Sequence, residues 1–332
     1  MRTVVIGGTG HIGTYLVPAL VRLGHQVTVL SRGERTPYQS DGAWQRVELI
    51  EVDREAEDAA GTFGQRVAEL NPDIGIDLIC FTEDSARQLA EAVQGRIQHL
   101  LHCGTIWVHG PSVIVPTRED TPRRPFGEYG VQKAAIEAYL LGKARRDGLP
   151  VTIVHPGHIC GPGWTPVNPA GNFDLGVFDK LAQGDGVLLP NFGLETLNPV
   201  HAADVAGVFL AAIANRSTAL GESFHAVASD AVTLREVRRE RGRLVRSGSR
   251  PDLRVLGRMA ADRFRPGRRG YAGPHPAQPQ LLDGQGGPPA RLPAALLRCR
   301  GRPGRDRVAR RQRQDHYLDA GWGSNGRAAS RC

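Results

Sequence analysis

A glycine-rich turn near the N-terminus constrains the fold more than any other feature of the sequence. The segment 7–13, Gly-Gly-Thr-Gly-His-Ile-Gly, stands between an apolar run typical of a buried strand and an amphipathic run typical of a helix. Gly7 permits a tight turn, Gly10 lets the backbone approach a pyrophosphate, and Gly13 lets the helix pack against the strand. The helix start would then face the anion with unpaired N–H groups. We therefore expect a dinucleotide-binding turn here, with a plain turn of an α/β protein as the alternative.

Strand-like and helix-like segments alternate after this turn as far as residue 234. Strands are expected at residues 3–6, 26–30, 47–52, 76–81, 99–103 and 151–155, and helices at residues 12–23, 59–70, 85–93 and 128–146. Apolar strands separated by amphipathic helices indicate a parallel sheet that is covered on both faces, with right-handed crossovers. The sequence therefore predicts an α/β fold, a doubly wound parallel sheet.

The composition is that of a globular protein. The chain has 332 residues, of which 40% are hydrophobic, so it can bury a sizeable core. No run of 18 apolar residues is present, which argues against a membrane span. The N-terminus leads directly into the first strand without a secretory segment, and the five cysteines are scattered. We therefore expect a cytoplasmic protein with reduced thiols.

The last third of the chain differs in charge. Residues 1–234 carry a net charge of −8 and residues 235–332 a net charge of +16, and the whole chain has 39 Arg but only 3 Lys. Because large aliphatic residues are few there, we expect low order in the Arg/Gly/Pro-rich tail at 241–332. The tail has three interpretations: a nucleic-acid-binding extension, a disordered segment without function, or an aberrant continuation from a shifted reading frame. Nucleic acid is the least expected partner, because charge runs are usually solvated.

The end of the second predicted strand favours NADP as the cofactor. An NAD site usually places an acidic residue here, whereas this chain has Ser31 and Arg32, with Arg35 nearby. A hydroxyl and a guanidinium would bind a 2′-phosphate that an acid would repel. NAD remains the alternative. After the third strand, Asp53 is a candidate for binding the adenine amino group or, alternatively, for forming a turn.

A tyrosine and a lysine four residues apart are the candidate catalytic pair. Tyr129 and Lys133 fall in the predicted helix 128–146, where residues at this spacing share a face. A nearby ammonium should lower the pKa of the phenol, so that Tyr129 exchanges a proton with a hydroxyl or carbonyl. Thr105 follows the strand 99–103, at the edge where such sheets bind ligands, and its hydroxyl could donate to a substrate oxygen. The alternatives are a structural Tyr–Lys pair and a loop-capping threonine.

In combination these motifs resemble those of the extended short-chain dehydrogenase/reductases, which include the NAD-dependent epimerase/dehydratases of nucleotide sugars. The resemblance covers residues 1–240 and is carried by the glycines at 7–13, Thr105 before Val108-His109-Gly110, Tyr129-x-x-x-Lys133, His-Pro-Gly-His-Ile-Cys-Gly-Pro-Gly at 155–163 and Leu-Asn-Pro-Val-His-Ala-Ala-Asp-Val-Ala at 197–206. Two departures are His155, where the family commonly has Arg, and Cys160, where it commonly has Tyr.

The resemblance implies a domain organisation and a set of roles. A Rossmann domain is expected at 1–163, with 196–216 packed back on it, and a smaller substrate lobe at 164–195 and 217–240. Tyr129 is implied as the acid/base, Lys133 as its electrostatic partner and a ribose ligand, and Thr105 as the usual Ser/Thr. The expected cofactor contacts are Gly7, Thr9, Gly10, His11, Ile12, Gly13, Ser31, Arg32, Asp53, Phe81, Lys133 and Pro156. The family also implies a homodimer.

Weaker signals concern the substrate and metals. His158 and Asn172 follow the sixth strand, so we expect them to line the substrate pocket. Six histidines invite a metal site, but their spacings match no recognised ligand pattern, and we expect no metal. They are His99, His102, His109, His155, His158 and His201.

Two classes of function follow. The first is an enzyme that performs NAD(P)-dependent oxidoreductase, epimerase or dehydratase chemistry on a hydroxyl or carbonyl of a sugar-like or other small polar substrate. The second is a non-catalytic NAD(P)-sensing or RNA-binding protein on the same fold. The complete set of Thr105, Tyr129 and Lys133 favours the enzyme, because a sensor would not need all three.

Overall fold

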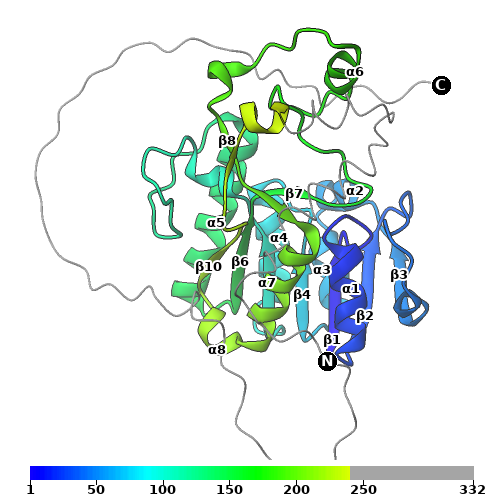
Figure 1. The fold of residues 1–332 in the computed structure, drawn as a ribbon. Coiled ribbons are helices and arrows are strands. Elements are labelled where there is room, and N and C mark those ends of the chain that lie inside the picture. Colours follow the sequence, from blue (N-terminus) through cyan, green and yellow to red (C-terminus); the bar gives the residue numbers. More distant parts are fainter. Residues whose placement is uncertain (240–332) are drawn as a thin grey trace, which may run out of the picture. The chain divides into compact units, whose positions relative to one another are not determined.

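Seven parallel strands form the central sheet of the computed structural model, which describes residues 1–239 (Figure 1). Their order across the sheet is β10-β6-β5-β4-β1-β2-β3. The strands are β1 (Arg2–Ile6), β2 (Gln26–Ser31), β3 (Val47–Glu51), β4 (Ile74–Asp77), β5 (His99–Cys103), β6 (Val151–Pro156) and β10 (Ser223–Ala226). The predicted Rossmann arrangement is therefore confirmed. The strand order reverses between β1 and β4, the point at which such sheets bind ligands beyond their carboxyl ends.

Helices cover both faces of the sheet (Figure 1). They are α1 (Gly13–Arg22), α2 (Arg54–Ala59), α3 (Phe63–Glu69), α4 (Glu83–Val93), α5 (Gly127–Asp147), α6 (Gly176–Gln183), α7 (Ala202–Ala214) and α8 (Arg216–Ala219). On one face α1 and α7 pack around Leu16 and Phe209, and on the other α3, α4 and α5 pack around Phe63 and Ile136, all fully buried. Among the helices of residues 1–239, none combines the length and apolar character needed to cross a bilayer.

Two predicted elements have different bounds. The predicted helix 59–70 begins later, as α3, and a separate helix, α2, ends at Ala59, because the chain turns at Gly61, whose φ is +70°. The predicted strand 76–81 is instead β4, which begins and ends earlier and includes Gly75. A Cβ atom at Gly75 would lie 2.9 Å from Cδ1 of Ile97, so close packing explains the glycine inside this strand.

The predicted substrate lobe includes a strand of the main sheet as well as elements beyond its carboxyl edge. Within the segment 217–240, β10 is an edge strand of the main sheet and pairs with β6. The helix α6 of the predicted lobe and two short ladders lie beyond the carboxyl ends of the strands (Figure 1). The ladders join β7 (His158–Cys160) to β9 (Pro199–His201) and β8 (Thr196–Leu197) to β11 (Val232–Thr233). The predicted tail at 241–332 lies outside the described residues.

A buried arginine joins α2 to two other elements at the carboxyl edge of the sheet. Arg54 donates to both carboxylate oxygens of Asp77, at the end of β4, over 2.6 and 3.0 Å. It also donates to Ser85 of α4 over 2.8 Å and to Asp58 over 3.2 Å. Burial raises the pKa of Asp77, but the charge and hydrogen bonds of Arg54 outweigh burial and lower this pKa. Each of these two buried charges is therefore tolerated only because the other neutralises it.

Replacing Arg54 with Met should lower the free energy of unfolding by about 3–5 kcal/mol, because Asp77 becomes an unpaired buried charge. Chemical denaturation at pH 7 measures this effect. The control is Arg66→Ala, which removes an exposed partner of Glu57 and should leave the denaturation midpoint unchanged. An Arg54→Met protein as stable as the wild type would contradict the structural role of the pair.

Candidate active site

The glycine loop has the close contacts that its sequence predicts. Gly7 has a φ of +78°, and a Cβ atom there would lie 2.6 Å from Cγ2 of Ile79. A Cβ atom at Gly13 would lie only 1.9 Å from the carbonyl oxygen of Gly8, so α1 begins directly against the turn. The loop is closed by a hydrogen bond of 3.1 Å from the Gly10 amide to the Gly7 carbonyl. The start of α1 therefore lies directly behind the loop, and a helix N-terminus in this place favours a bound anion.

A cavity of about 610 Å³ extends from this loop along the ends of β2 and β3. Seven of the predicted cofactor residues line it: Gly7, Thr9, Gly10, Ser31, Arg32, Asp53 and Phe81. Five do not: His11, Ile12, Gly13, Lys133 and Pro156. A bare glycine backbone, a hydroxyl, a guanidinium and an apolar wall fit the pyrophosphate, ribose and adenine of a dinucleotide.

At the end of the cavity where we expect adenosine to bind, two charged side chains already contact other residues of the chain. Arg32 lies 3.3 Å from Glu34, and both side chains are more than half exposed, so this ion pair is weak. Arg35 lines the same cavity. Asp53 caps α2 by accepting from the amide of Ala56 over 3.1 Å. The turn-forming alternative for Asp53 therefore holds, and its contact with adenine stays a prediction.

Lys133 is 2% exposed and lies under the site. Its ammonium donates to the carbonyl oxygens of Cys80 over 2.7 Å and Cys103 over 2.9 Å, which ties α5 to the ends of β4 and β5. The same nitrogen lies 5.0 Å from the ring centre of Phe81 and 5.9 Å from that of Tyr129. An ammonium has three donors, so one remains for a ribose or substrate hydroxyl.

Tyr129 lies one turn before Lys133 on α5, and its phenol lies near the side chain of Thr105. The prediction that its pKa is lowered is wrong in this structure. Although 46% of the residue is exposed, burial of the hydroxyl and the neighbouring Cys103 raise its pKa, Thr105 only partly opposes them, and the result is a pKa of about 12. The physical reason is that burial of the phenol disfavours its charged form. The phenol is therefore protonated at neutral pH.

Thr105 caps a turn beside the site, and its catalytic role stays a prediction. It is 6% exposed and begins the short helix η2 (Ile106–His109), where its hydroxyl accepts from the amide of Trp107 over 3.3 Å. Its own amide donates to Nδ1 of His155 over 3.0 Å. Thr105 therefore caps a turn, as the simpler alternative has it, and also places its hydroxyl against Tyr129.

The two predicted substrate residues make local contacts. Nδ1 of His158 accepts from the amide of Asn198 over 3.3 Å, beside the ladder of β7 and β9. The side-chain oxygen of Asn172 accepts from the amide of Asp174 over 3.0 Å, within a loop. Their contact with substrate stays a prediction.

An aromatic group next to Tyr129 was missed by the sequence analysis. The ring of Trp107 is stacked 5.7 Å from that of Phe126 and lies edge-on at 6.2 Å from that of Tyr129. Phe126 directly precedes α5 and is 48% exposed. Such rings offer a flat apolar surface to a ligand. The sequence signal was an aromatic residue two positions after Thr105.

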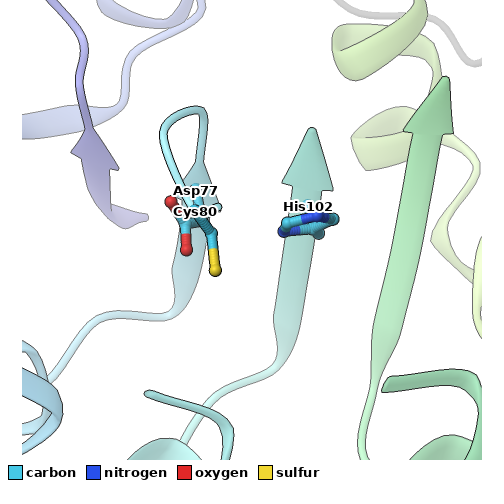
Figure 2. A group of neighbouring side chains, drawn as sticks. All are labelled: Asp77, Cys80 and His102. Carbon is cyan, nitrogen blue, oxygen red and sulfur yellow. The ribbon is translucent and has the colours of Figure 1, made fainter. Parts of the chain in front are cut away.

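Figure 2 shows Asp77, at the end of β4, and Cys80, just after it, beside one another and facing His102 of β5. Their potential ligand atoms lie within 4.8 Å of one another, and all three residues are buried. Arg54 occupies the Asp77 carboxylate, and burial and Asp77 raise the pKa of the Cys80 thiol to about 11. A neighbouring guanidinium and a protonated thiol disfavour a cation, so we interpret the cluster as polar core packing. The absence of a metal stays a prediction.

Comparison with known proteins gives a family and a fold. The sequence model of the NAD dependent epimerase/dehydratase family matches residues 3–226. A crystal structure of UDP-glucose 4-epimerase with UDP-glucose from Thermotoga maritima superposes with a TM-score of 0.59 at 20% identity, over 76% of this chain and 84% of that one. At this identity the structural likeness shows the fold alone.

Two curated relatives differ in their described activity. The 2'-dehydrokanamycin reductase of Streptomyces kanamyceticus is 31% identical over 137 residues, which are 41% of this chain and 37% of the relative. The chloroplast stem-loop binding protein of 41 kDa b of Arabidopsis thaliana is 25% identical over 224 residues, 64% of this chain and 55% of the relative. The chain thus spans about a third of the length of the reductase and about half of the length of the stem-loop binding protein.

Gly13→Ala is expected to weaken dinucleotide binding by about tenfold or more, because the added methyl group overlaps the carbonyl of Gly8 and displaces the start of α1. Fluorescence titration with NADPH measures the dissociation constant. Gly207→Ala in α7, where a Cβ atom meets nothing within 4 Å, is the control and should bind as the wild type does. Equal affinity of the Gly13→Ala protein would contradict the role given to this turn.

Proposed function

Because the chain belongs to the NAD-dependent epimerase/dehydratase family, we propose that it is an NADP-dependent enzyme acting on the carbonyl or hydroxyl of a sugar-like or other small polar substrate. The observation that carries this proposal is the buried ammonium of Lys133, which donates to the carbonyl oxygens of Cys80 and Cys103 and lies one helical turn from Tyr129. A phenol, a hydroxyl and an ammonium meet at the carboxyl edge of the sheet, where the ligands of this fold bind.

Each of the three residues has a distinct role in this proposal. The cofactor, when bound, supplies the hydride exchange. Tyr129 donates its proton to the substrate oxygen or takes one from it, and Thr105 donates a hydrogen bond to the same oxygen. The remaining donor of Lys133 holds a ribose hydroxyl. The aromatic surface of Trp107 offers a face on which a flat or sugar-like substrate packs.

The protonated state of Tyr129 favours carbonyl reduction as the direction of the reaction. A phenol whose pKa is raised to about 12 is a proton donor at neutral pH and a poor base. Reduction needs a proton for the alkoxide that forms, and this residue holds one. Oxidation of an alcohol, with which epimerisation and dehydration begin, needs the tyrosinate. Among the relatives, a reductase fits this preference.

The proposal of NADP rests on the adenosine end of the cavity. Ser31 offers a hydroxyl, and Arg32 and Arg35 offer two guanidinium groups, where an acidic residue would bind the ribose of NAD. The exposed contact between Arg32 and Glu34 is easily exchanged for a phosphate. These groups suit a 2′-phosphate better than a free hydroxyl.

RNA binding is the second candidate, because one relative is a stem-loop binding protein. Binding of a labelled RNA stem-loop without any bound nicotinamide nucleotide would favour it. Nucleotide released from the purified, denatured protein, or bound on titration with NADPH, favours the enzyme. A protein that neither retains nor binds a nicotinamide nucleotide would refute the enzyme proposal.

Tyr129→Phe should reduce kcat by about a hundredfold or more while the dissociation constant for NADPH changes little, because the variant lacks only the exchangeable proton. The assay follows NADPH oxidation with dihydroxyacetone, 2,3-butanedione and UDP-glucose as probe substrates. The control is Tyr139→Phe on the same helix, which loses only a 3.3 Å hydrogen bond to Glu91. Full turnover by Tyr129→Phe would refute the mechanism.

Arg32→Ala should weaken NADP⁺ binding by about tenfold and leave NAD⁺ binding nearly unchanged, because the guanidinium is proposed to bind only the 2′-phosphate. Isothermal titration with both nucleotides measures the two affinities. Arg46→Ala, outside the cofactor cavity, serves as the control. Equal losses for both nucleotides, or no loss for NADP⁺, would contradict the assignment.

A further inference from the structure

His155 is fully buried on β6 and joins the predicted catalytic threonine to a buried ion pair. Its Nδ1 accepts the backbone N–H of Thr105 over 3.0 Å, and its Nε2 lies 3.2 Å from Oε1 of Glu137 on α5. Nε of Arg123 donates to the other oxygen of Glu137 over 2.8 Å. A continuous chain of contacts therefore leads from a guanidinium through a carboxylate and an imidazole to the main chain of Thr105.

These contacts determine which imidazole nitrogen of His155 carries the proton. Because Nδ1 accepts an N–H group, the proton of the neutral ring is on Nε2, which donates to Glu137. Burial raises the pKa of Glu137, but hydrogen bonds from Arg123 and His155 outweigh burial and lower it to about 2. A permanent anion thus orients the ring from one side, and the ring presents a lone pair to Thr105 on the other.

Close packing holds the imidazole in this orientation. A Cβ atom on Gly104, which precedes Thr105, would lie 2.4 Å from Nδ1 of His155. On the remaining sides, the ring of His225, in register on β10, lies at 6.1 Å and the ring of His109 at 6.5 Å. These two histidines are joined by a contact of 2.9 Å between their Nε2 atoms. The ring of His155 therefore has little freedom to turn away from Thr105.

We propose that His155 is a positioning residue, which holds the backbone of Thr105 so that the Thr105 hydroxyl meets the phenol of Tyr129. The inference rests on the proposed function, since it concerns the reaction only if Thr105 and Tyr129 act on the substrate. His155 acts through Thr105 and touches neither substrate nor cofactor. Its lone pair fixes the amide at the point where the chain leaves β5 and enters the catalytic turn. A shift of a catalytic group by about 1 Å costs up to about a hundredfold in rate.

Two amide variants of His155 remove the hydrogen bonds of its two ring nitrogens one at a time. In His155→Asn the side-chain oxygen lies near the position of Nδ1, so it still accepts from the amide of Thr105 but no longer reaches Glu137. In His155→Gln the amide lies near the position of Nε2, so it still donates to Glu137 but leaves the amide of Thr105 without an acceptor. Both variants lose the ring and its packing, and each is therefore the other's control for stability.

The first measurement is the ¹H–¹⁵N resonance and the hydrogen exchange of the Thr105 amide. His155→Asn should keep the amide protected, and His155→Gln should lose protection. In the second, with the probe substrates above, His155→Asn should keep kcat within about threefold, whereas His155→Gln should lose about tenfold to a hundredfold at nearly unchanged KM and NADPH affinity. Thermal unfolding of both variants shows that they remain folded.

The inference is overturned if the two variants lose kcat equally, if His155→Asn is the more impaired, or if both act as the wild type does. It is also overturned if the Thr105 amide is equally protected in both. A wild type that neither binds NADPH nor turns over a probe refutes the proposed function instead. In that case the amide measurement still decides whether His155 holds Thr105.

Discussion

A buried ammonium bonded to two backbone carbonyl oxygens determines how the site is arranged. Lys133 is almost inaccessible, and a charge in such a place is tolerated only if its hydrogen bonds are satisfied. Its acceptors belong to Cys80 after β4 and Cys103 at the end of β5, so the lysine holds the start of α5 over the carboxyl edge of the sheet. Tyr129, one turn earlier on the same helix, is placed over that edge as a consequence. The helix that carries Tyr129 and Lys133 is therefore fixed to the end of β5 and to the segment after β4.

The fold was largely predictable from local patterns. The glycine turn and the alternation of apolar and amphipathic runs indicate a doubly wound sheet, because these patterns reflect burial on one or both faces. The sheet position of β10 and the glycine inside β4 were not predictable in the same way. Both depend on partners distant in the chain: β10 pairs with β6, and Gly75 makes room for Ile97. Pairing across such distances has no local signal.

The sequence predicted which residues the candidate site contains, but it did not predict how their surroundings change their pKa values. Spacing on one helix brings Tyr129 and Lys133 together, and a strand end brings Thr105 to the same edge. The raised pKa of Tyr129 arises from burial of its hydroxyl in the folded chain, which spacing does not reveal. His155 stood out in the sequence only as a replacement for a common Arg. Its contacts with Thr105 and Glu137 require the packing of β6 against β5 and α5.

The most direct test of this account is a crystal structure of the protein with NADP⁺. The account predicts that the pyrophosphate binds at the glycine turn and that the 2′-phosphate lies beside Arg32. A substrate whose oxygen is bonded to the Tyr129 hydroxyl is expected to have its reacting carbon about 3–4 Å from the reactive carbon of the nicotinamide. It also predicts that Lys133 keeps its two carbonyl bonds and gives its third donor to the nicotinamide ribose. A nicotinamide directed away from Tyr129, or a nucleotide bound outside the cavity beside the glycine turn, would contradict it.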